Sequence, residues 1–455
     1  MLIIVYVVAW IVGVALLVDG AVWLSWPIRR IRWRRSVLKR VRVLTEAGAA
    51  KPVSRRRALW ARGKGLICVM IGVVIVWQMP IECRSIRDHA TGMTVSPAGM
   101  EATVEAVDRA IQPLLSAYPD TVTIGLLRGE ETTCFSYARG SKTAEADSGN
   151  AIFEIGSITK VFTSVLLCSM AEAGEVNLSD PLRQHLPQEM SLPATEQREV
   201  NLEDVATHYS GLPRLPDNLI DWCDLVTLRS IRNPYSGYTH DDLVKGLSSV
   251  ALAAPPGTRY EYSNLGAGLL GLALSTAAGM PYEDAVVERI CIPLRMHDTR
   301  IRLSDAQSMR LLPGYGESVR CCGVVVTYRA QNWQMPWLEG AGALRSTAND
   351  MLLFLKASIT PDDTPVGRAL RKSQEPRYLV NGRLAVGLGW HITDCSKSKA
   401  VYWHNGMTGG YSAYIAFNRE ARAGVVVLSN SAAVVDGIGI KALQELMREA
   451  GTQPE

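Results

Sequence analysis

Two long apolar runs near the N-terminus dominate the hydrophobic pattern of this chain. Residues 2–26 are almost continuously apolar, and residues 65–81 form a second run after a basic stretch at residues 28–64. At about 1.5 Å of rise per residue, the first run can cross a hydrocarbon layer of roughly 30 Å, and the second is just long enough. The pattern predicts two transmembrane helices; the alternative is a buried hydrophobic hairpin in a soluble protein.

The charge pattern sets the orientation expected of these helices. The first 64 residues hold 14 Lys or Arg against only Asp19 and Glu46, whereas the rest of the chain is net acidic. Loops rich in Lys and Arg stay in the cytoplasm, so the loop at residues 28–64 is expected there. Residues 1–95 would then form a multi-pass anchor in the lipid bilayer of the cell membrane, and residues 96–455 an extracytoplasmic domain.

From about residue 99 the pattern becomes that of a mixed α/β domain. An opening helix at residues 100–118 precedes two strands at residues 121–128 and 131–139, which a turn at Gly129 and Glu130 joins. The further expected elements are helices at residues 161–173 and 265–278 and strands of alternating pattern at residues 411–417 and 424–428. The chain is therefore expected to hold one large domain after the anchor.

Composition excludes several kinds of site. The body of the chain has no basic face interleaved with aromatic residues and no zinc-finger spacing, so no nucleic-acid partner is expected. The nine cysteines are scattered and odd in number, without a C-x-x-C pair or a Cys/His cluster. We expect no metal site and no cofactor.

The candidate nucleophile is Ser157, which lies between a predicted strand and a predicted helix. It begins an S-x-x-K motif with Lys160, and residues i and i+3 of a helix share one face. A lysine whose pKa is lowered by burial can accept the seryl proton, and a helix N-terminus favours the developing negative charge. The same spacing recurs at Ser36 and Ser396, but only Ser157 follows a glycine at a strand-to-helix junction. Taken alone, the motif fits an ordinary helix-capping serine equally well.

Two further motifs contain candidate site residues. Tyr262 and Asn264 alternate in an extended segment and would face one cavity, the phenol as a proton carrier and the amide as a hydrogen-bonding partner for substrate. Downstream, His404 and Gly406 precede Met407 at the end of a predicted strand. The glycine would admit a substrate backbone, and the Met407 N–H would face an oxyanion. Alone, the first motif is more typical of a turn, and a lone histidine is usually structural.

The ordered motifs SITK at residues 157–160, YSN at residues 262–264 and HNG at residues 404–406 resemble those of serine β-lactamases and penicillin-binding proteins. Surrounding segments are similar too, including FEIGSITK, THYSGLP, PPGTRYEYSNLG and WHNGMTGGYSAYIAF. Tyrosine in the second motif resembles class C β-lactamases, D-Ala-D-Ala carboxypeptidases, D-aminopeptidases and related esterases. The resemblance implies an antiparallel sheet of N- and C-terminal strands flanked by helices, with a largely helical region at about residues 175–340.

The resemblance also implies roles for the site residues. Ser157 would be the acylated nucleophile, and Lys160 and Tyr262 would exchange its proton. Asn264 would orient the substrate amide, and the backbone N–H groups of Ser157 and Met407 would form an oxyanion hole. The expected substrate is a small molecule or peptide: a D-amino-acid peptide, a peptidoglycan stem, a β-lactam or an ester.

His404 stands where the true β-lactamases carry lysine. Histidine is mostly neutral at pH 7, so it should hold a substrate carboxylate less firmly than an ammonium group does. This departure favours a peptidase or esterase, with a true β-lactamase as the alternative. A second alternative is a non-catalytic, membrane-tethered scaffold or sensor with the same fold, although all the expected catalytic side chains are present. The sequence leaves the natural acyl donor and the oligomeric state open.

Overall fold

The computed structural model describes residues 100–115, 121–138, 141–143, 148–193, 198–219, 233–316, 319–321, 324–326, 328–394 and 399–451. All of them belong to one compact unit, Ile81–Glu455. The predicted transmembrane helices at residues 2–26 and 65–81, and the basic loop between them, lie outside the described residues. Within the described ranges no single helix has the length and hydropathy to span a bilayer. The one pair that has them jointly, Asn264–Ala278 with Tyr282–Cys291, is bent by 81°.

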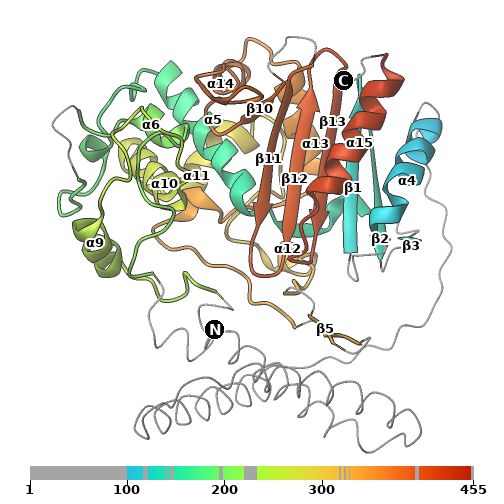
Figure 1. Ribbon diagram of the computed structural model, residues 1–455, viewed down its shortest axis with the longest axis horizontal. Helices are drawn as coiled ribbons and strands as arrows, with labels where there is room; N and C mark the ends of the chain where they lie inside the picture. The colour runs from blue at the N-terminus through green and yellow to red at the C-terminus, as the bar shows by residue number, and fades with distance from the viewer. Residues whose placement is uncertain are drawn as a thin grey trace, which may run out of the picture. The chain divides into compact units, whose positions relative to one another are not determined.

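The centre of the unit is a nine-stranded antiparallel sheet (Figure 1). Its strand order is β3-β2-β1-β13-β12-β11-β10-β9-β8, so an N-terminal hairpin pairs with the C-terminal strands. The strands are β1 (Thr121–Arg128), β2 (Glu131–Ala138), β3 (Ser141–Thr143), β8 (Tyr378–Asn381), β9 (Leu384–Val386), β10 (His391–Thr393), β11 (Val401–Met407), β12 (Ser412–Asn418) and β13 (Ala423–Ser429). This confirms the expected sheet of N- and C-terminal strands.

Helices cover both faces of the sheet. α4 (Glu101–Leu115) and α15 (Asp436–Glu449) pack on one face, where Val425 and Val427 point toward them (Figure 1). The intervening Val426 points to the other face, which is covered by α13 (Ala348–Ile359); α14 (Pro365–Ser373) packs on α5 (Thr159–Glu172) in the same apolar core. Because both faces are covered, every residue of β12 and β13 is buried.

Residues 175–340 contribute a second region beside the sheet. Its regular elements are the 3-10 turns Leu182–His185 and Glu339–Ala341, α6 (Leu202–Ala206), α9 (His240–Ser249), α10 (Asn264–Ala278), α11 (Tyr282–Val286), a π-helical turn at Val287–Cys291, α12 (Asp305–Ser308) and the hairpin β5 (Val319–Cys321) and β6 (Val324–Val326). Among these described elements only α9 and α10 reach ten residues. Loops connect these elements over much of the part of this region that the structure describes.

A two-stranded sheet fixes the segment that leads to Ser157. β4 (Ile152–Glu154) pairs antiparallel with β7 (Arg345–Thr347). The buried Glu154 carboxylate accepts hydrogen bonds from Asn332 Nδ2 at 3.1 Å and from the Trp333 N–H at 2.9 Å, and it pairs with Arg345 at 3.4 Å. A buried carboxylate needs such partners. These contacts tie β4 to the loop at residues 332–333, which forms part of the site described next.

Candidate active site

Ser157 is the middle residue of a 3-10 turn, Gly156–Ile158, that joins β4 to α5. The expected helix start is therefore a tighter turn that precedes the α-helix. Gly156 has φ +50°, and a Cβ atom there would come within 2.6 Å of the Met407 backbone nitrogen. Only glycine allows the turn to lie directly on the end of β11. This contact brings Ser157 and Met407, which are far apart in sequence, to one place.

Lys160 lies one helical turn after Ser157 and faces it. Its Nζ is 3.0 Å from Ser157 Oγ and 2.7 Å from the carbonyl oxygen of Ala341. The side chain is only 2% exposed. Burial, assisted by the positive charge of Arg214, holds the pKa of Lys160 well below its ordinary value. A neutral amine at this distance can accept the seryl proton.

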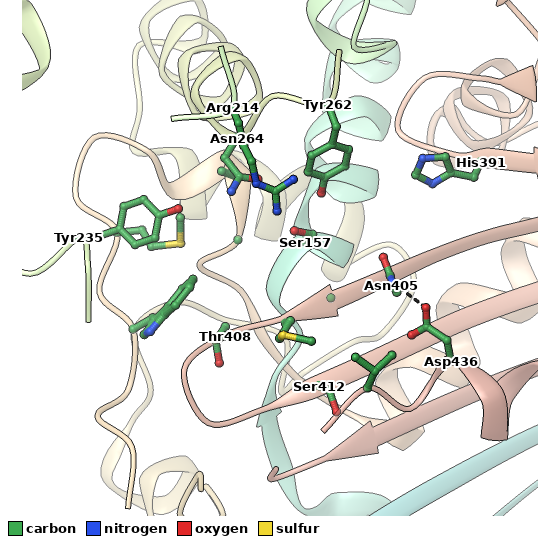
Figure 2. A pocket seen from close by; sticks show the side chains of 17 residues that line it. Ser157, Arg214, Tyr235, Tyr262, Asn264, His391, Asn405, Thr408, Ser412 and Asp436 are labelled. Carbon is green, nitrogen blue, oxygen red and sulfur yellow. Dashed lines mark hydrogen bonds between the residues drawn. The ribbon is translucent and has the colours of Figure 1, made fainter. Parts of the chain in front are cut away.

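Tyr262 closes the site on the side opposite β11 (Figure 2). Burial raises the pKa of Tyr262 to about 12, and a hydrogen bond with Ser157 and the charge of Arg214 oppose that rise. Lys160 Nζ lies 5.0 Å from the centroid of the tyrosine ring. Ser157, Lys160 and Tyr262 therefore form one contact group, with the phenol protonated at neutral pH and able to relay a proton.

His208, which the sequence analysis did not identify, fixes the segment that carries Tyr262. Its Nδ1 accepts a hydrogen bond from the Ser263 N–H at 3.2 Å, and its carbonyl accepts one from the Glu261 N–H at 2.7 Å. The imidazole packs on the Tyr262 ring with 4.4 Å between centroids. Burial lowers the pKa of His208, which suits a neutral ring that accepts at Nδ1. Its place in the THYSGLP segment was the available signal.

Asn264 lines the same cavity as Tyr262, but through a different local structure from the one expected. The chain leaves the extended conformation at Ser263, whose side chain caps α10 by accepting from the Gly266 N–H at 2.8 Å. Asn264 is the first residue of that helix. Its Oδ1 is buried and has no hydrogen-bond partner among the described residues. A buried amide oxygen without a partner is uncommon in folded proteins.

The end of β11 completes the wall beside Ser157. A Cβ atom at Gly406 would come 1.9 Å from the carbonyl oxygen of Ile155 and 3.0 Å from the Ser157 nitrogen. The strand and the 3-10 turn are thus in direct backbone contact. The backbone nitrogens of Ser157 and Met407 both lie at this contact, since a Cβ atom at Gly156 would come 2.6 Å from the Met407 nitrogen.

His404 lies beneath the cavity surface. It is 1% exposed, and it is absent from the residues that line the cavity. Its Nδ1–H donates to the carbonyl oxygen of Asn405 at 2.6 Å, which leaves Nε2 as an acceptor without a partner among the described residues. Burial first, and then the nearby His391 and Lys160, hold the pKa of His404 well below its ordinary value. The imidazole of His404 is therefore neutral, and its ring centroid lies 6.4 Å from that of Tyr262.

The cavity has a volume of about 530 Å³ and two walls of different origin (Figure 2). Ser157, Tyr262, Asn264, Gly406 and Met407 line it together, as expected, with Lys160 directly behind. Lining residues that the sequence analysis missed come from both walls. The region at residues 175–340 contributes Arg214, Tyr235, Trp333 and Met335; the sheet contributes His391, Asn405 and Ser412, and the start of α15 and the loop before it contribute Asp436 and Val434.

Known proteins match this chain in sequence and in fold. The family model described as "Beta-lactamase" matches residues 107–445. A β-lactamase of Yersinia enterocolitica is 26% identical over 335 residues, which cover 65% of this chain and 78% of the relative. The D-alanyl-D-alanine-carboxypeptidase/endopeptidase AmpH of Escherichia coli (strain K12) is 27% identical over 292 residues, which cover 61% of this chain and 71% of the relative.

A solved structure, the β-lactamase/D-alanine carboxypeptidase from Pseudomonas syringae, shares the fold. It superposes with a TM-score of 0.61 at 19% identity and covers 77% of this chain and 99% of its own. The match of the family model over most of the length shows that the chain belongs to the β-lactamase family. It is a serine hydrolase of the superfamily that includes the penicillin-binding proteins, which confirms the resemblance of its motifs.

Proposed function

We propose that the enzyme acts by forming an acyl-enzyme on Ser157. Lys160 accepts the seryl proton, and Tyr262 relays it to the leaving group. The backbone N–H groups of Ser157 and Met407 stabilise the tetrahedral oxyanion. The observation that carries this proposal is the 3.0 Å separation of Lys160 Nζ and Ser157 Oγ, at a lysine whose pKa burial holds well below its ordinary value.

Asn264 orients the acyl part of the substrate in this proposal. Its unpartnered Oδ1 accepts a hydrogen bond from a substrate amide N–H next to the scissile carbonyl. Gly406 leaves room for the substrate backbone along β11. His404 then acts from behind Tyr262, as a neutral acceptor beneath the wall, instead of touching the substrate carboxylate.

The substrate class that we propose is a D-amino-acid peptide, a peptidoglycan stem or an ester. The name of the Escherichia coli relative, a D-alanyl-D-alanine-carboxypeptidase/endopeptidase, supports the peptide. The neutral, buried His404 supports a substrate that does not depend on an ammonium group at that position. A second candidate is β-lactam hydrolysis, which the β-lactamase of Yersinia enterocolitica supports.

Covalent labelling tests the nucleophile. A fluorophosphonate and a fluorescent penicillin should each modify the purified full-length protein at Ser157, as located by peptide mass spectrometry, and Ser157→Ala should abolish both adducts. Ser36→Ala and Ser396→Ala, the serines of the other two S-x-x-K sequences, serve as matched controls and should label normally. A folded protein that neither reagent labels would overturn the proposal. Full cellular activity of Ser157→Ala would favour the scaffold alternative.

Turnover separates the two candidate substrate classes. Rapid, repeated hydrolysis of nitrocefin would favour the β-lactamase. Trapping of nitrocefin as a stable adduct, together with turnover of D-Ala peptides or short esters, is the result expected of the peptidase or esterase. Each assay uses the same full-length preparation, and Ser157→Ala provides the background.

We also propose that residues 1–95 anchor the enzyme in the cell membrane and place residues 96–455 outside the cytoplasm. The two apolar runs and the basic loop between them support this arrangement. Alkaline phosphatase joined after residue 90 should be active, whereas a fusion near residue 45 should be inactive. The reverse pattern would overturn the orientation, and a full-length protein that stays in the soluble fraction would overturn the anchor.

A further inference from the structure

We propose that Arg214 binds a carboxylate carried by the acyl group of the substrate, and so makes the enzyme selective for anionic acyl donors. This inference rests on the acyl-enzyme proposed above. It places the recognition of a substrate carboxylate on the wall formed by residues 175–340, and not at position 404.

The backbone of Arg214 is fixed to the start of α10. Its carbonyl oxygen accepts hydrogen bonds from the Asn264 N–H at 2.9 Å and from the Leu265 N–H at 3.2 Å. Its side chain extends into the cavity, with Cζ 5.2 Å from the centroid of the Tyr262 ring (Figure 2). Lys160 Nζ lies 5.0 Å from the same centroid. The guanidinium is therefore placed by rigid elements close to the catalytic group.

The guanidinium has no ion-pair partner in the part of the chain that the structure describes. Among the described residues no carboxylate lies within 4.0 Å of it, whereas other arginines of the same unit are paired, such as Arg198 with Asp204 and Arg345 with Glu154. A planar guanidinium with free donors is the side chain best suited to bidentate recognition of a carboxylate. The simpler explanation is a solvated arginine that rests on an aromatic ring, which the experiment below distinguishes.

The other charged groups of the cavity direct an anion to this wall. Among the described lining residues, Arg214 is the only cation, since burial lowers the pKa of His391 to about 4 and leaves it neutral. The opposite wall carries Asp436, which accepts a hydrogen bond from Asn405 Nδ2 at 2.7 Å (Figure 2). A carboxylate at that wall would meet an acidic residue and no cation, so the region beside Arg214 is the favourable one.

The neighbours of Arg214 indicate which part of the substrate carries the charge. Asn264, which we assign to the substrate amide, is joined to Arg214 by a backbone hydrogen bond at the start of α10. Both residues therefore face the same part of the substrate, and we place the carboxylate on the acyl group and not on the leaving group. Tyr235 and Trp333 line this wall and pack edge to face at 5.2 Å between centroids. They offer an apolar surface for the chain between the scissile carbonyl and the carboxylate.

A matched pair of esters tests the proposal. Mono-4-nitrophenyl adipate carries a terminal carboxylate, and its methyl ester is the same acyl donor without the charge; the leaving group is identical. The ratio of the two kcat/KM values should favour the anionic ester in the wild type. Arg214→Gln should lower that ratio about tenfold, the scale of one charge-assisted contact. Arg214→Lys keeps the positive charge but loses the paired N–H donors of the guanidinium, and it should lower the ratio less.

The ratio separates binding from the electrostatic effect of Arg214 on Lys160. Loss of the cation also raises the pKa of Lys160, which slows the hydrolysis of both esters equally. This effect alone would leave the ratio unchanged. Arg109→Gln, which removes an exposed charge from α4, is the matched control and should behave as wild type. A ratio in Arg214→Gln within twofold of wild type would overturn the proposal, even if both activities fall.

A binding measurement keeps the test independent of turnover. Adipamic acid, with one carboxylate and one amide, should slow fluorophosphonate labelling of Ser157 in the wild type and do so about tenfold less effectively in Arg214→Gln. Equal protection of both proteins would overturn the role of Arg214 while leaving the nucleophile in place. Absence of any labelling would overturn the acyl-enzyme itself, so the two failures are distinguishable.

Discussion

Gly406 of β11 packs against the carbonyl oxygen of Ile155, so closely that a Cβ atom at position 406 would lie 1.9 Å from that oxygen. The contact holds the strand against the turn that carries Ser157. The active site therefore depends on a backbone-to-backbone contact between two segments that are some 250 residues apart in the chain.

Gly406→Ala should consequently open the proposed oxyanion hole. The added methyl group forces the strand from the turn at a cost of about 1–3 kcal/mol in the free energy of unfolding. Displacement of one oxyanion donor should lower kcat by about 10²–10³-fold. Gly382→Ala is the matched control, because a Cβ atom there meets nothing within 4 Å. Ester hydrolysis and thermal unfolding measure both effects; near-normal kcat in Gly406→Ala would contradict the proposed geometry.

Lys160→Met should remove the base and keep the side-chain volume. General base catalysis contributes about 10²–10⁴-fold, so kcat/KM should fall by that factor while the fold is retained. Lys441→Met, an exposed lysine of α15, should leave activity unchanged. Burst kinetics with a 4-nitrophenyl ester would show whether the acylation step is the one that slows.

Arg214→Gln should move the acidic limb of the pH profile to higher pH. The guanidinium contributes to the low pKa of Lys160, so its removal raises that pKa, and a higher pH is then needed to form the neutral amine. The profile of kcat/KM on the uncharged ester is the measurement. Arg214→Lys retains the cation and should keep the limb near its wild-type position. An unchanged or lower limb in Arg214→Gln would contradict the coupling.

Tyr262→Phe should lower kcat/KM by about 10²-fold with little change in the melting temperature. The ring that packs on His208 remains, and only the hydroxyl that hydrogen bonds with Ser157 is lost. Tyr260→Phe makes the same chemical change two residues away, where the hydroxyl contacts His391 Nε2 at 2.9 Å. Its effect on kcat/KM should stay below tenfold. Equal losses in the two variants would argue against a proton relay through Tyr262.

Stability should decline as the pH falls from about 7 toward 4. Burial lowers the pKa of His391 to about 4 and the pKa values of His208 and His404 as well. Between the folded and unfolded pKa values the unfolded chain binds more protons, so the stabilisation is complete above about pH 6.5 and is lost as the pH drops through this window. Each unit of pKa shift corresponds to about 1.4 kcal/mol.

His391→Gln isolates one part of this dependence. The difference between its free energy of unfolding and that of the wild type should change with pH between 6.5 and 4, because the buried carboxyl groups such as Glu154 contribute equally to both proteins. Urea denaturation at several pH values is the measurement. A difference that is constant with pH would show that His391 does not titrate as described.

Local signals in the sequence were enough for the elements and for the nucleophile. Apolar periodicity predicted α5, α10 and the hairpin of β1 and β2, and the structure has all of them. Spacing alone could not separate Ser157 from Ser36 and Ser396, but its position between a strand and a helix did. Tyr262 and Asn264 were expected to line one cavity, and they do. The local structure differs from the expected extended segment, because Ser263 caps a helix that begins at Asn264.

The tertiary structure decided which side chains surround the nucleophile and in which charge state. Arg214, His391 and Asp436 carry no local mark of a site, and they reach it only because β10, β11, α15 and the start of α10 converge there. Burial is likewise a property of the fold: it holds the pKa of Lys160 well below its ordinary value and places His404 beneath the cavity wall. Sequence fixes the order and period of chemical groups, whereas desolvation and proximity arise only when distant segments pack together.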